Sequence, residues 1–155
     1  MSPGLRAVVA YVASRLITKA ESSFIFDFSA GGHRSMGGTV SEACINVYDF
    51  SENCQLTGHM TGGAFQLFHH GDRVHVSLEI IGETFRGYDQ IAGRHFSGAV
   101  NGARVSLKDD ADLRGYTYWC ESPQCTRLPE QGTEGIEGEL DSQAQEAEPE
   151  NPVVK

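Results

Sequence analysis

The chain lacks the features by which membrane and secreted proteins are usually recognised. None of its apolar runs approaches the roughly 20 residues that a membrane-spanning helix needs. The apolar stretch at residues 7–13 is short, is soon followed by Arg15 and lacks a convincing cleavage site, so we do not interpret it as a signal peptide. We therefore expect a cytoplasmic protein, with insertion of an amphipathic N-terminal segment into a membrane or another protein as a weaker alternative.

Basic residues are also scarce. The 155 residues include 12 Lys and Arg against 21 Asp and Glu, a formal net charge of −9. Most of this charge comes from residues 128–155, which hold eight acidic residues, one basic residue and no aromatic residue. Such a segment cannot bury enough apolar surface to order itself, so we predict one domain at residues 1–127 and a disordered acidic tail at residues 128–155. The missing basic surface argues against nucleic acid as a partner.

Motifs that would indicate an enzyme are missing as well. The chain has no nucleophile elbow, no phosphate-binding glycine loop and no metalloprotease signature. Its four cysteines come without a secretory signal, and we expect free thiols. Cys120 and Cys125 are a single pair, whereas a structural zinc site needs four ligands. We therefore predict no catalytic residue, no cofactor and no metal site, and we favour a non-enzymatic protein.

The chain does contain a tandem repeat of 20 residues. V-Y-D-F, L-F-H-H, G-Y-D-Q and L-K-D-D begin at residues 47, 67, 87 and 107. Each unit shows two short stretches of alternating apolar and polar residues, which is the period of a half-buried strand. Turn-forming segments rich in Gly, Asn and Asp separate the stretches. Each unit is therefore predicted to be a β-hairpin, and a degenerate unit beginning at Phe24 brings the antiparallel meander to about ten short strands.

Before the repeat, apolar residues recur at helical spacing. Leu5, Val8, Val9, Val12 and Leu16 mark one face of an amphipathic N-terminal helix over residues 3–20, preceded by the start signal Ser-Pro. The inner face of the sheet needs a cover, and the apolar face of the helix needs a partner. The predicted fold is thus mainly β, with the meander curled around or packed on this one helix.

The width of the sheet favours the curled form. Ten strands about 4.8 Å apart make a sheet about 48 Å wide, whereas one helix is only about 10–12 Å across. A flat sheet would leave apolar surface uncovered unless a second copy covered it, so we expect a curled monomer or a homodimer. Equal strands and equal loops predict no stagger, and a closed barrel requires one, so full closure is not expected.

The outer face of the sheet supplies the predicted binding residues. It is polar, with large aromatic residues at intervals, which is typical of a solvated face or a partner surface. The repeat predicts that His70 and His75 face each other across one hairpin, where two imidazoles could hold a transition metal, although exposed polar residues beside a turn would give the same pattern. The residues proposed for binding are Tyr48, Phe68, His70, His75, Tyr88 and His95.

Two features of the inner face remain open to alternative interpretations. Gly58, Gly87 and Gly98 leave room for another element, so a cavity between helix and sheet could serve a small-ligand carrier or an enzyme. The aspartates at the third position of each unit, replaced by His69 in the second, are expected near the rim of the buried face. We interpret them as acceptors for backbone N–H groups of the adjoining loops, while a catalytic role remains an alternative.

The units V-Y-D-F, G-Y-D-Q-I-A-G-R-H-F-S-G-A-V and R-V-S-L-K-D-D resemble the tandem Y-D-Y and G-x-x-F-x-G pattern of small bacterial proteins of unknown function. The resemblance covers about residues 24–118 and implies an architecture, without any activity, substrate or catalytic residue. The third aromatic residue of that pattern is replaced here by His70, Gln90 and Asp110. The resulting hypothesis is a non-enzymatic interaction module whose partner is a protein or a small ligand.

Overall fold

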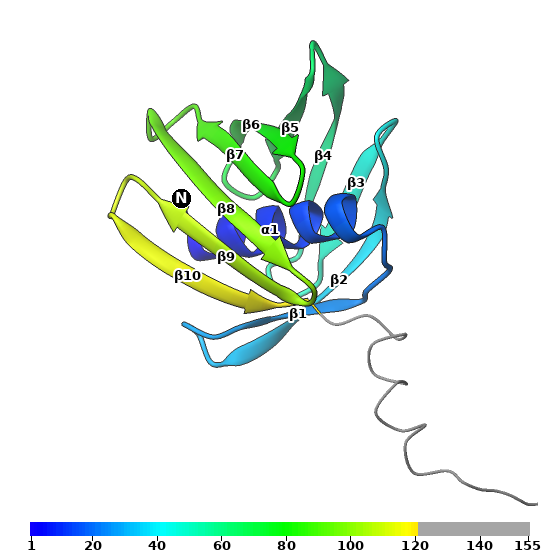
Figure 1. The fold of residues 1–155 in the computed structure, drawn as a ribbon, viewed down its shortest axis with the longest axis vertical. Coiled ribbons are helices and arrows are strands. Elements are labelled where there is room, and N and C mark those ends of the chain that lie inside the picture. The colour runs from blue at the N-terminus through cyan, green and yellow to red at the C-terminus, as the bar shows by residue number, and fades with distance from the viewer. Residues whose placement is uncertain (121–155) are drawn as a thin grey trace, which may run out of the picture. The chain divides into compact units, whose positions relative to one another are not determined.

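The computed structural model describes residues 1–120, which form one helix and ten antiparallel strands (Figure 1). The helix α1 (Pro3–Thr18) comes first, and the strands follow as a meander. Their bounds are β1 (Phe24–Asp27), β2 (Gly32–Val40), β3 (Ile45–Asp49), β4 (Cys54–Thr61), β5 (Ala64–His69), β6 (Val74–Ile81), β7 (Thr84–Asp89), β8 (Arg94–Asn101), β9 (Arg104–Asp109) and β10 (Arg114–Trp119). The predicted tail at residues 128–155 lies outside the described residues.

The helix begins and ends where its capping residues dictate. Ser2 is the N-cap, and its side chain accepts a hydrogen bond from the backbone N–H of Leu5, while Pro3 occupies the first turn. Lys19 adopts a left-handed conformation and its N–H donates to the carbonyl of Arg15, which ends the helix at Thr18. The prediction of a helix over residues 3–20 is thus confirmed to within two residues.

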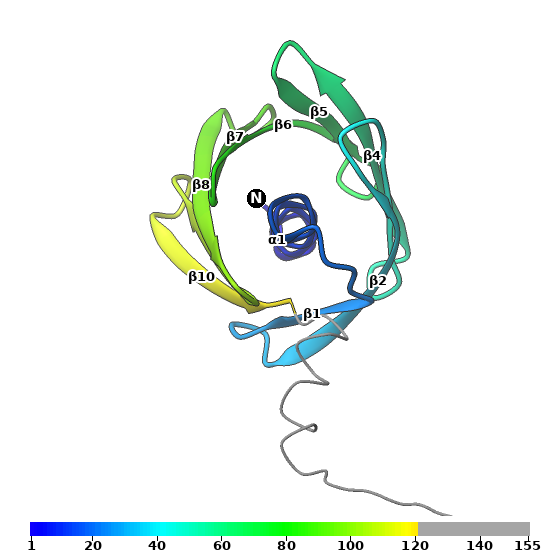
Figure 2. The same ribbon diagram turned by 45° about the vertical axis from the view of Figure 1, so that its right-hand side comes forward.

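The predicted meander curled around the helix is confirmed, and the sheet closes completely, so the expectation that it would lack the stagger for closure is wrong. β1 pairs with β10 through Phe26 with Trp119 and Asp27 with Tyr118, and every other strand pairs with its neighbours in the chain. Viewed nearly along the helix, the strands form a ring with α1 inside it (Figure 2). The inner face of the sheet therefore meets the helix on all sides.

Closure is possible because the ladders are staggered. Ile45 pairs with Gly58, and Gly58 pairs with Leu67, which lies 22 residues beyond Ile45 although the repeat is 20 residues long. The same step leads from Leu67 through Val76 to Asp89. Each repeat thus advances the ladder by two residues, which supplies the stagger that a barrel requires.

The stagger originates in the four-residue loops, which begin one residue earlier than predicted. His69 pairs with Val74, so the loop is residues 70–73 and His70 belongs to it. As a consequence Phe65 pairs with Leu78 and not with Ile80. The last residue of each loop is left-handed, with φ of 53° at Asn53, 58° at Arg73, 65° at Gly93 and 59° at Leu113.

The core lies between the helix and the inner face of the barrel. The helix is buried on nearly every side, although its sequence predicted one apolar and one polar face. Ala7, Ala10 and Ala13 are fully buried, and their small side chains allow strands to approach the helix closely. Even Arg6 is buried, with its guanidinium 3.8 Å from the centre of the Tyr116 ring. Among residues 1–120, no helix combines the length and apolar character required to cross a membrane.

Candidate functional site: the outer-face grooves

The residues predicted for binding lie on the outer face of β3 to β8 as three separate clusters. Alternation along each strand turns them away from the helix. In the second unit the ring of Phe68 lies 4.8 Å from that of His70 and 4.7 Å from that of His75. Tyr88 stacks edge-on against His95 at 4.9 Å, and Tyr48 does the same against Phe50. The structure thus brings each aromatic residue together with a ring of its own unit.

The predicted facing pair of histidines does not form. Because the loop begins at His70, His75 is paired with Phe68, and the aromatic ring lies between the two imidazoles. His70 instead contacts the hydroxyl of Thr57, with 3.0 Å between Nε2 and Oγ1. Within residues 1–120, no group of three His, Cys, Asp or Glu side chains is placed to hold a metal ion.

A fourth cluster of the same kind was missed by the sequence reasoning. The ring of His33 on β2 lies 4.9 Å from those of Phe24 and Phe26, and Phe26 lies 4.9 Å from Phe28. The sequence carries the signal, because F-I-F-D-F at residues 24–28 corresponds to V-Y-D-F. The imidazole could have been found by treating the degenerate unit as a full hairpin.

Grooves open on the outer face where inward-facing glycines interrupt the strands. One groove of 450 Å³ lies at Gly58 and is bordered by Phe68 and His75. A second of 310 Å³ lies at Gly87 and is bordered by Tyr88 and His95. Each groove thus has an aromatic residue and an imidazole in its lining.

On the inner side, the space at these glycines is filled by neighbouring side chains. A Cβ atom at Gly87 would lie 2.4 Å from the ring of Phe96, and one at Gly98 would lie 2.3 Å from the ring of Phe85. At Gly58 the Cβ would lie 2.7 Å from a methyl group of Leu67. The glycines therefore make room for these side chains, and none of the three positions opens a gap toward the helix.

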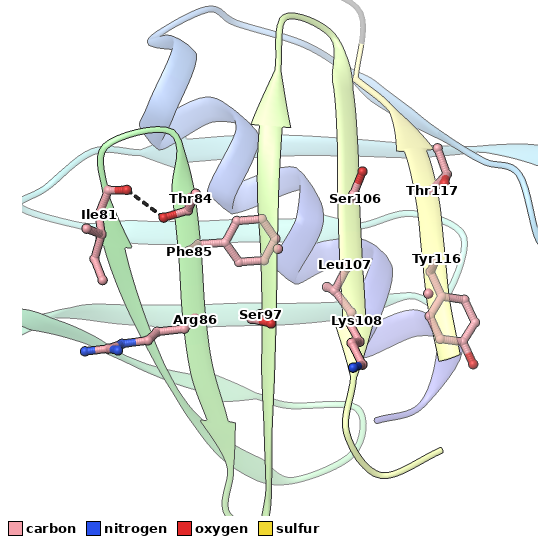
Figure 3. Close-up of a pocket in the computed structure, with 12 residues that line it drawn as sticks. Ile81, Thr84, Phe85, Arg86, Ser97, Ser106, Leu107, Lys108, Tyr116 and Thr117 are labelled. Atoms are coloured by element: carbon pink, nitrogen blue, oxygen red, sulfur yellow. Dashed lines mark hydrogen bonds between the residues drawn. The ribbon is translucent and has the colours of Figure 1, made fainter. Parts of the chain in front are cut away.

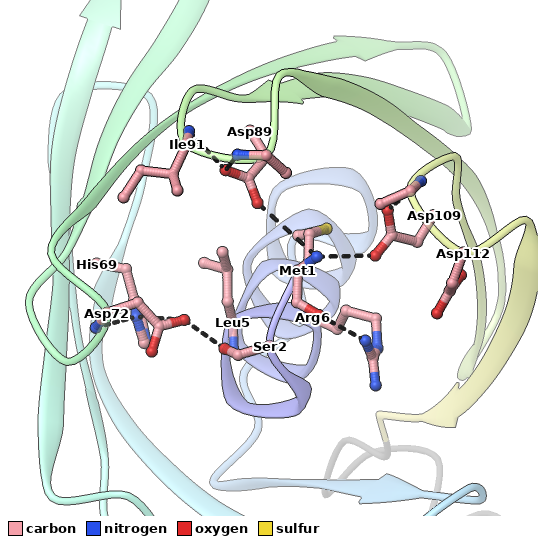
Figure 4. A network of polar contacts seen from close by, with 12 residues as sticks. Met1, Ser2, Leu5, Arg6, His69, Asp72, Asp89, Ile91, Asp109 and Asp112 are labelled. Carbon is pink, nitrogen blue, oxygen red and sulfur yellow. Dashed lines mark hydrogen bonds and ion pairs between the residues drawn. The ribbon is translucent and has the colours of Figure 1, made fainter.

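Two of the repeated aspartates, Asp89 and Asp109, lie with His69 around the start of the helix at one mouth of the barrel (Figure 4). Oδ1 of Asp49 accepts hydrogen bonds from the N–H groups of Ser51 and Glu52, at 2.8 and 3.2 Å. Asp27, Asp89 and Asp109 make the corresponding bonds in their own loops. The predicted role of these carboxylates as acceptors for the adjoining loop is thus confirmed.

The second oxygen of each aspartate faces cations held at the mouth. Oδ2 of Asp109 lies 3.0 Å from the amino group of Met1, and that of Asp89 lies 3.8 Å from it. Arg34 lies within 3.8 Å of Asp27 and Asp49, both almost fully buried. Burial raises the pKa of the Asp49 carboxyl, which the backbone N–H donors and then Arg34 oppose.

His69 takes the place of the aspartate in the second unit. Its Nδ1 accepts the N–H of Asp72 at 3.1 Å, as a carboxylate would, which leaves the proton on Nε2, 3.6 Å from Sγ of Cys54. Burial lowers the pKa of His69 and raises that of the Cys54 thiol. A neutral imidazole beside a protonated thiol is a packing arrangement and does not make an activated nucleophile.

Together these features define a class of protein by its architecture: a ten-stranded antiparallel barrel that is filled by its own N-terminal helix and grooved on its outer face. The chain matches no protein-family model, no curated protein and no solved structure.

Proposed function

We propose that this protein is a non-enzymatic binding module that presents the outer-face grooves of its barrel to a protein or a small ligand. The pairing of an aromatic ring with an imidazole at the edge of a groove carries this proposal. It occurs twice, with Phe68 and His75 at Gly58 and with Tyr88 and His95 at Gly87. An aromatic ring offers a large apolar contact at small cost in conformational entropy, and an imidazole can both donate and accept hydrogen bonds.

The packing of the interior supports a surface function. The helix occupies the barrel, and phenylalanine and leucine side chains fill the space at the inner glycines. This packing gives no support to the alternative of a carrier or an enzyme that uses a cavity between helix and sheet. Since the barrel encloses its own apolar face, the fold supports a monomer. We place the protein in the cytoplasm on the sequence features alone.

The test uses the double variant Phe68→Ser and Tyr88→Ser, because each side chain lies on the outer face and contributes little to the core. We expect far-ultraviolet circular dichroism and urea unfolding close to those of the wild type. Recovery of a binding partner on the immobilised protein, followed by titration with that partner in purified form, should show loss of binding in the variant.

The matched control replaces two other exposed apolar residues. Ile91 and Leu113 are 71% and 75% exposed, lie in loops and are not among the residues that line the two grooves. The double variant Ile91→Ser and Leu113→Ser removes a comparable amount of exposed apolar surface. It should bind as the wild type does. Equal binding by all three proteins would show that the aromatic residues at the grooves are not the binding surface.

A further inference from the structure

The fourth unit departs from the repeat at two positions that lie opposite each other. In the third unit Tyr88 is paired with His95, and the two rings stack over the outer face. The corresponding pair in the fourth unit is Lys108 with Gly115. Gly115 has no neighbouring atom within 4 Å of the position of a Cβ. A stacked pair of rings is therefore replaced by a cation beside open space.

A larger groove lies at this place. It has a volume of 690 Å³, compared with 310 Å³ for the groove at Gly87, and it crosses the outer face from β7 to β10 (Figure 3). Volumes of this size are typical of small-molecule sites. Ile81, which is 46% exposed, is the exposed apolar side chain of its lining, whereas Phe85, Leu107 and Tyr116 border the groove from the core. The hydroxyl groups of Thr84, Ser97, Ser106 and Thr117 provide donors and acceptors along it.

The charged residues of the groove are all basic. Arg86 is paired with Ser97, and Ser97 is paired with Lys108, so the backbone places a hydroxyl-bearing residue between two basic residues on three adjacent strands. Strands two apart lie about 9.6 Å from each other, which leaves space for one anionic group above Ser97. The exposed side chain of Arg86 extends away from Ser97 and pairs with Glu79 at 2.9 Å, so Lys108 is the cation that faces this space (Figure 3). Within residues 1–120, Lys108 makes no ion pair closer than 4 Å.

We propose that this groove binds a small amphiphilic anion, in which a carboxylate or phosphate is joined to an apolar body. The anionic group lies above Ser97 beside Lys108, which donates a charge-assisted hydrogen bond to it. The apolar body lies along the groove against Ile81 and over Gly98 and Gly115, which carry no side chain. An inorganic anion would leave Ile81 in contact with water, and a neutral apolar molecule would leave Lys108 without a partner. The inference rests on the proposed function, since it names the ligand class of one outer-face groove.

The test is a calorimetric titration of the full chain with four probes that share a ten-carbon body. Decanoate and decyl phosphate carry the anion, decanol is neutral and decyltrimethylammonium is a cation, all used below their critical micelle concentrations. We expect saturable 1:1 binding of decanoate, decyl phosphate or both, and at least tenfold weaker binding of the other two. Whichever anion binds more tightly identifies the headgroup.

Two variants test the position of the ligand by independent means. Lys108→Gln removes the cation and should weaken binding of the anion by about tenfold, the loss expected for one charge-assisted hydrogen bond. Gly115→His restores the residue that the second and third units carry at this position, and it should block the groove without a change in formal charge. The control Arg104→Gln removes a positive charge from the same strand outside the groove lining, and it should bind as the wild type does.

Three results would overturn the inference: no saturable binding of either anion, equal binding of decanol, or equal weakening by Arg104→Gln and Lys108→Gln. The second would indicate apolar contact alone, and the third a general attraction of charge. Amide shifts of Ser97, Lys108 and Thr117 in a nuclear magnetic resonance titration locate the ligand. Phe68 and Tyr88 are not among the residues of this groove. The anion titration and the partner-recovery experiment can therefore fail independently of each other.

Discussion

The aromatic ring of Phe85 on β7 lies against Gly98, its paired residue on β8. The neighbouring pair is reversed, with Gly87 on β7 facing the ring of Phe96 on β8. Each ring thus fills the space that the opposite glycine leaves. Because each phenylalanine lies opposite a glycine, two neighbouring strands can both carry large aromatic side chains on the inner face of a barrel that already contains a helix.

Gly98→Ala is expected to lower the free energy of unfolding by about 3 kcal/mol, near the upper end of typical overpacking costs. The added Cβ would lie 2.1 Å from the carbonyl oxygen of Ser106 as well as 2.3 Å from the ring of Phe85, and the backbone atom cannot rotate away. Urea denaturation measures the change. Gly115→Ala is the control, since its Cβ would enter open space. Similar unfolding midpoints for the two variants would contradict the packing described for Phe85.

Arg34 is expected to stabilise the barrel mouth through the carboxylates that surround it. Arg34→Met would leave Asp27 and Asp49 buried without this cation, and we expect a loss of about 3 kcal/mol in the free energy of unfolding. Asp49 is only 1% exposed, so water cannot compensate. Combining Arg34→Met with Asp49→Asn should recover part of the loss, because a neutral amide still accepts the loop N–H groups. Additive losses in this double-mutant cycle would mean that Arg34 and Asp49 are not coupled.

Stability should fall in mild acid because of His69. Burial lowers the pKa of His69 from its ordinary value of 6.5 in the native state. In mild acid the unfolded chain therefore binds a proton at this imidazole more readily than the native protein does. The contribution of His69 is fully present above pH 6.5 and is lost as the pH falls through the lowered pKa. His69→Asn keeps an acceptor for the N–H of Asp72 but does not titrate. Chemical denaturation from pH 7.5 to 5 should therefore show a shallower fall for this variant, and parallel curves would exclude a role for His69.

Tyr118 should make the protein sensitive to alkali. Desolvation raises its pKa from 10.0 to about 12, since the side chain is fully buried beside Asp27 at the closure of the barrel. Between pH 10 and 12 the unfolded tyrosine ionises before the native one, so the free energy of unfolding falls as the pH rises. Tyr118→Phe should remove about 3 kcal/mol of that fall, at about 1.4 kcal/mol per pKa unit. An identical decline in both proteins, measured by denaturant titration at each pH, would refute this assignment.

Much of the architecture and part of the candidate site could be predicted from the sequence. Tyr48, Phe68, Tyr88 and His95 were placed on the outer face by alternation alone, which is a local property of the strand. The carboxylates of Asp49, Asp89 and Asp109 were recognised as acceptors for the adjoining loops. Their donors are backbone N–H groups only two or three positions further along the chain, so these contacts are also local. These inferences need no knowledge of how distant segments meet.

The sequence by itself thus determined the 20-residue hairpin, the inward and outward faces and the N-terminal helix, because each depends on residues within a few positions of one another. Only the tertiary structure decided that the sheet closes. Each four-residue loop begins one residue earlier than predicted. His75 therefore pairs with Phe68 and not with His70, and each repeat adds a stagger of two residues. The energy that selects this register comes from packing ten strands around the helix and joining β1 to β10, and those contacts exist only in the assembled barrel.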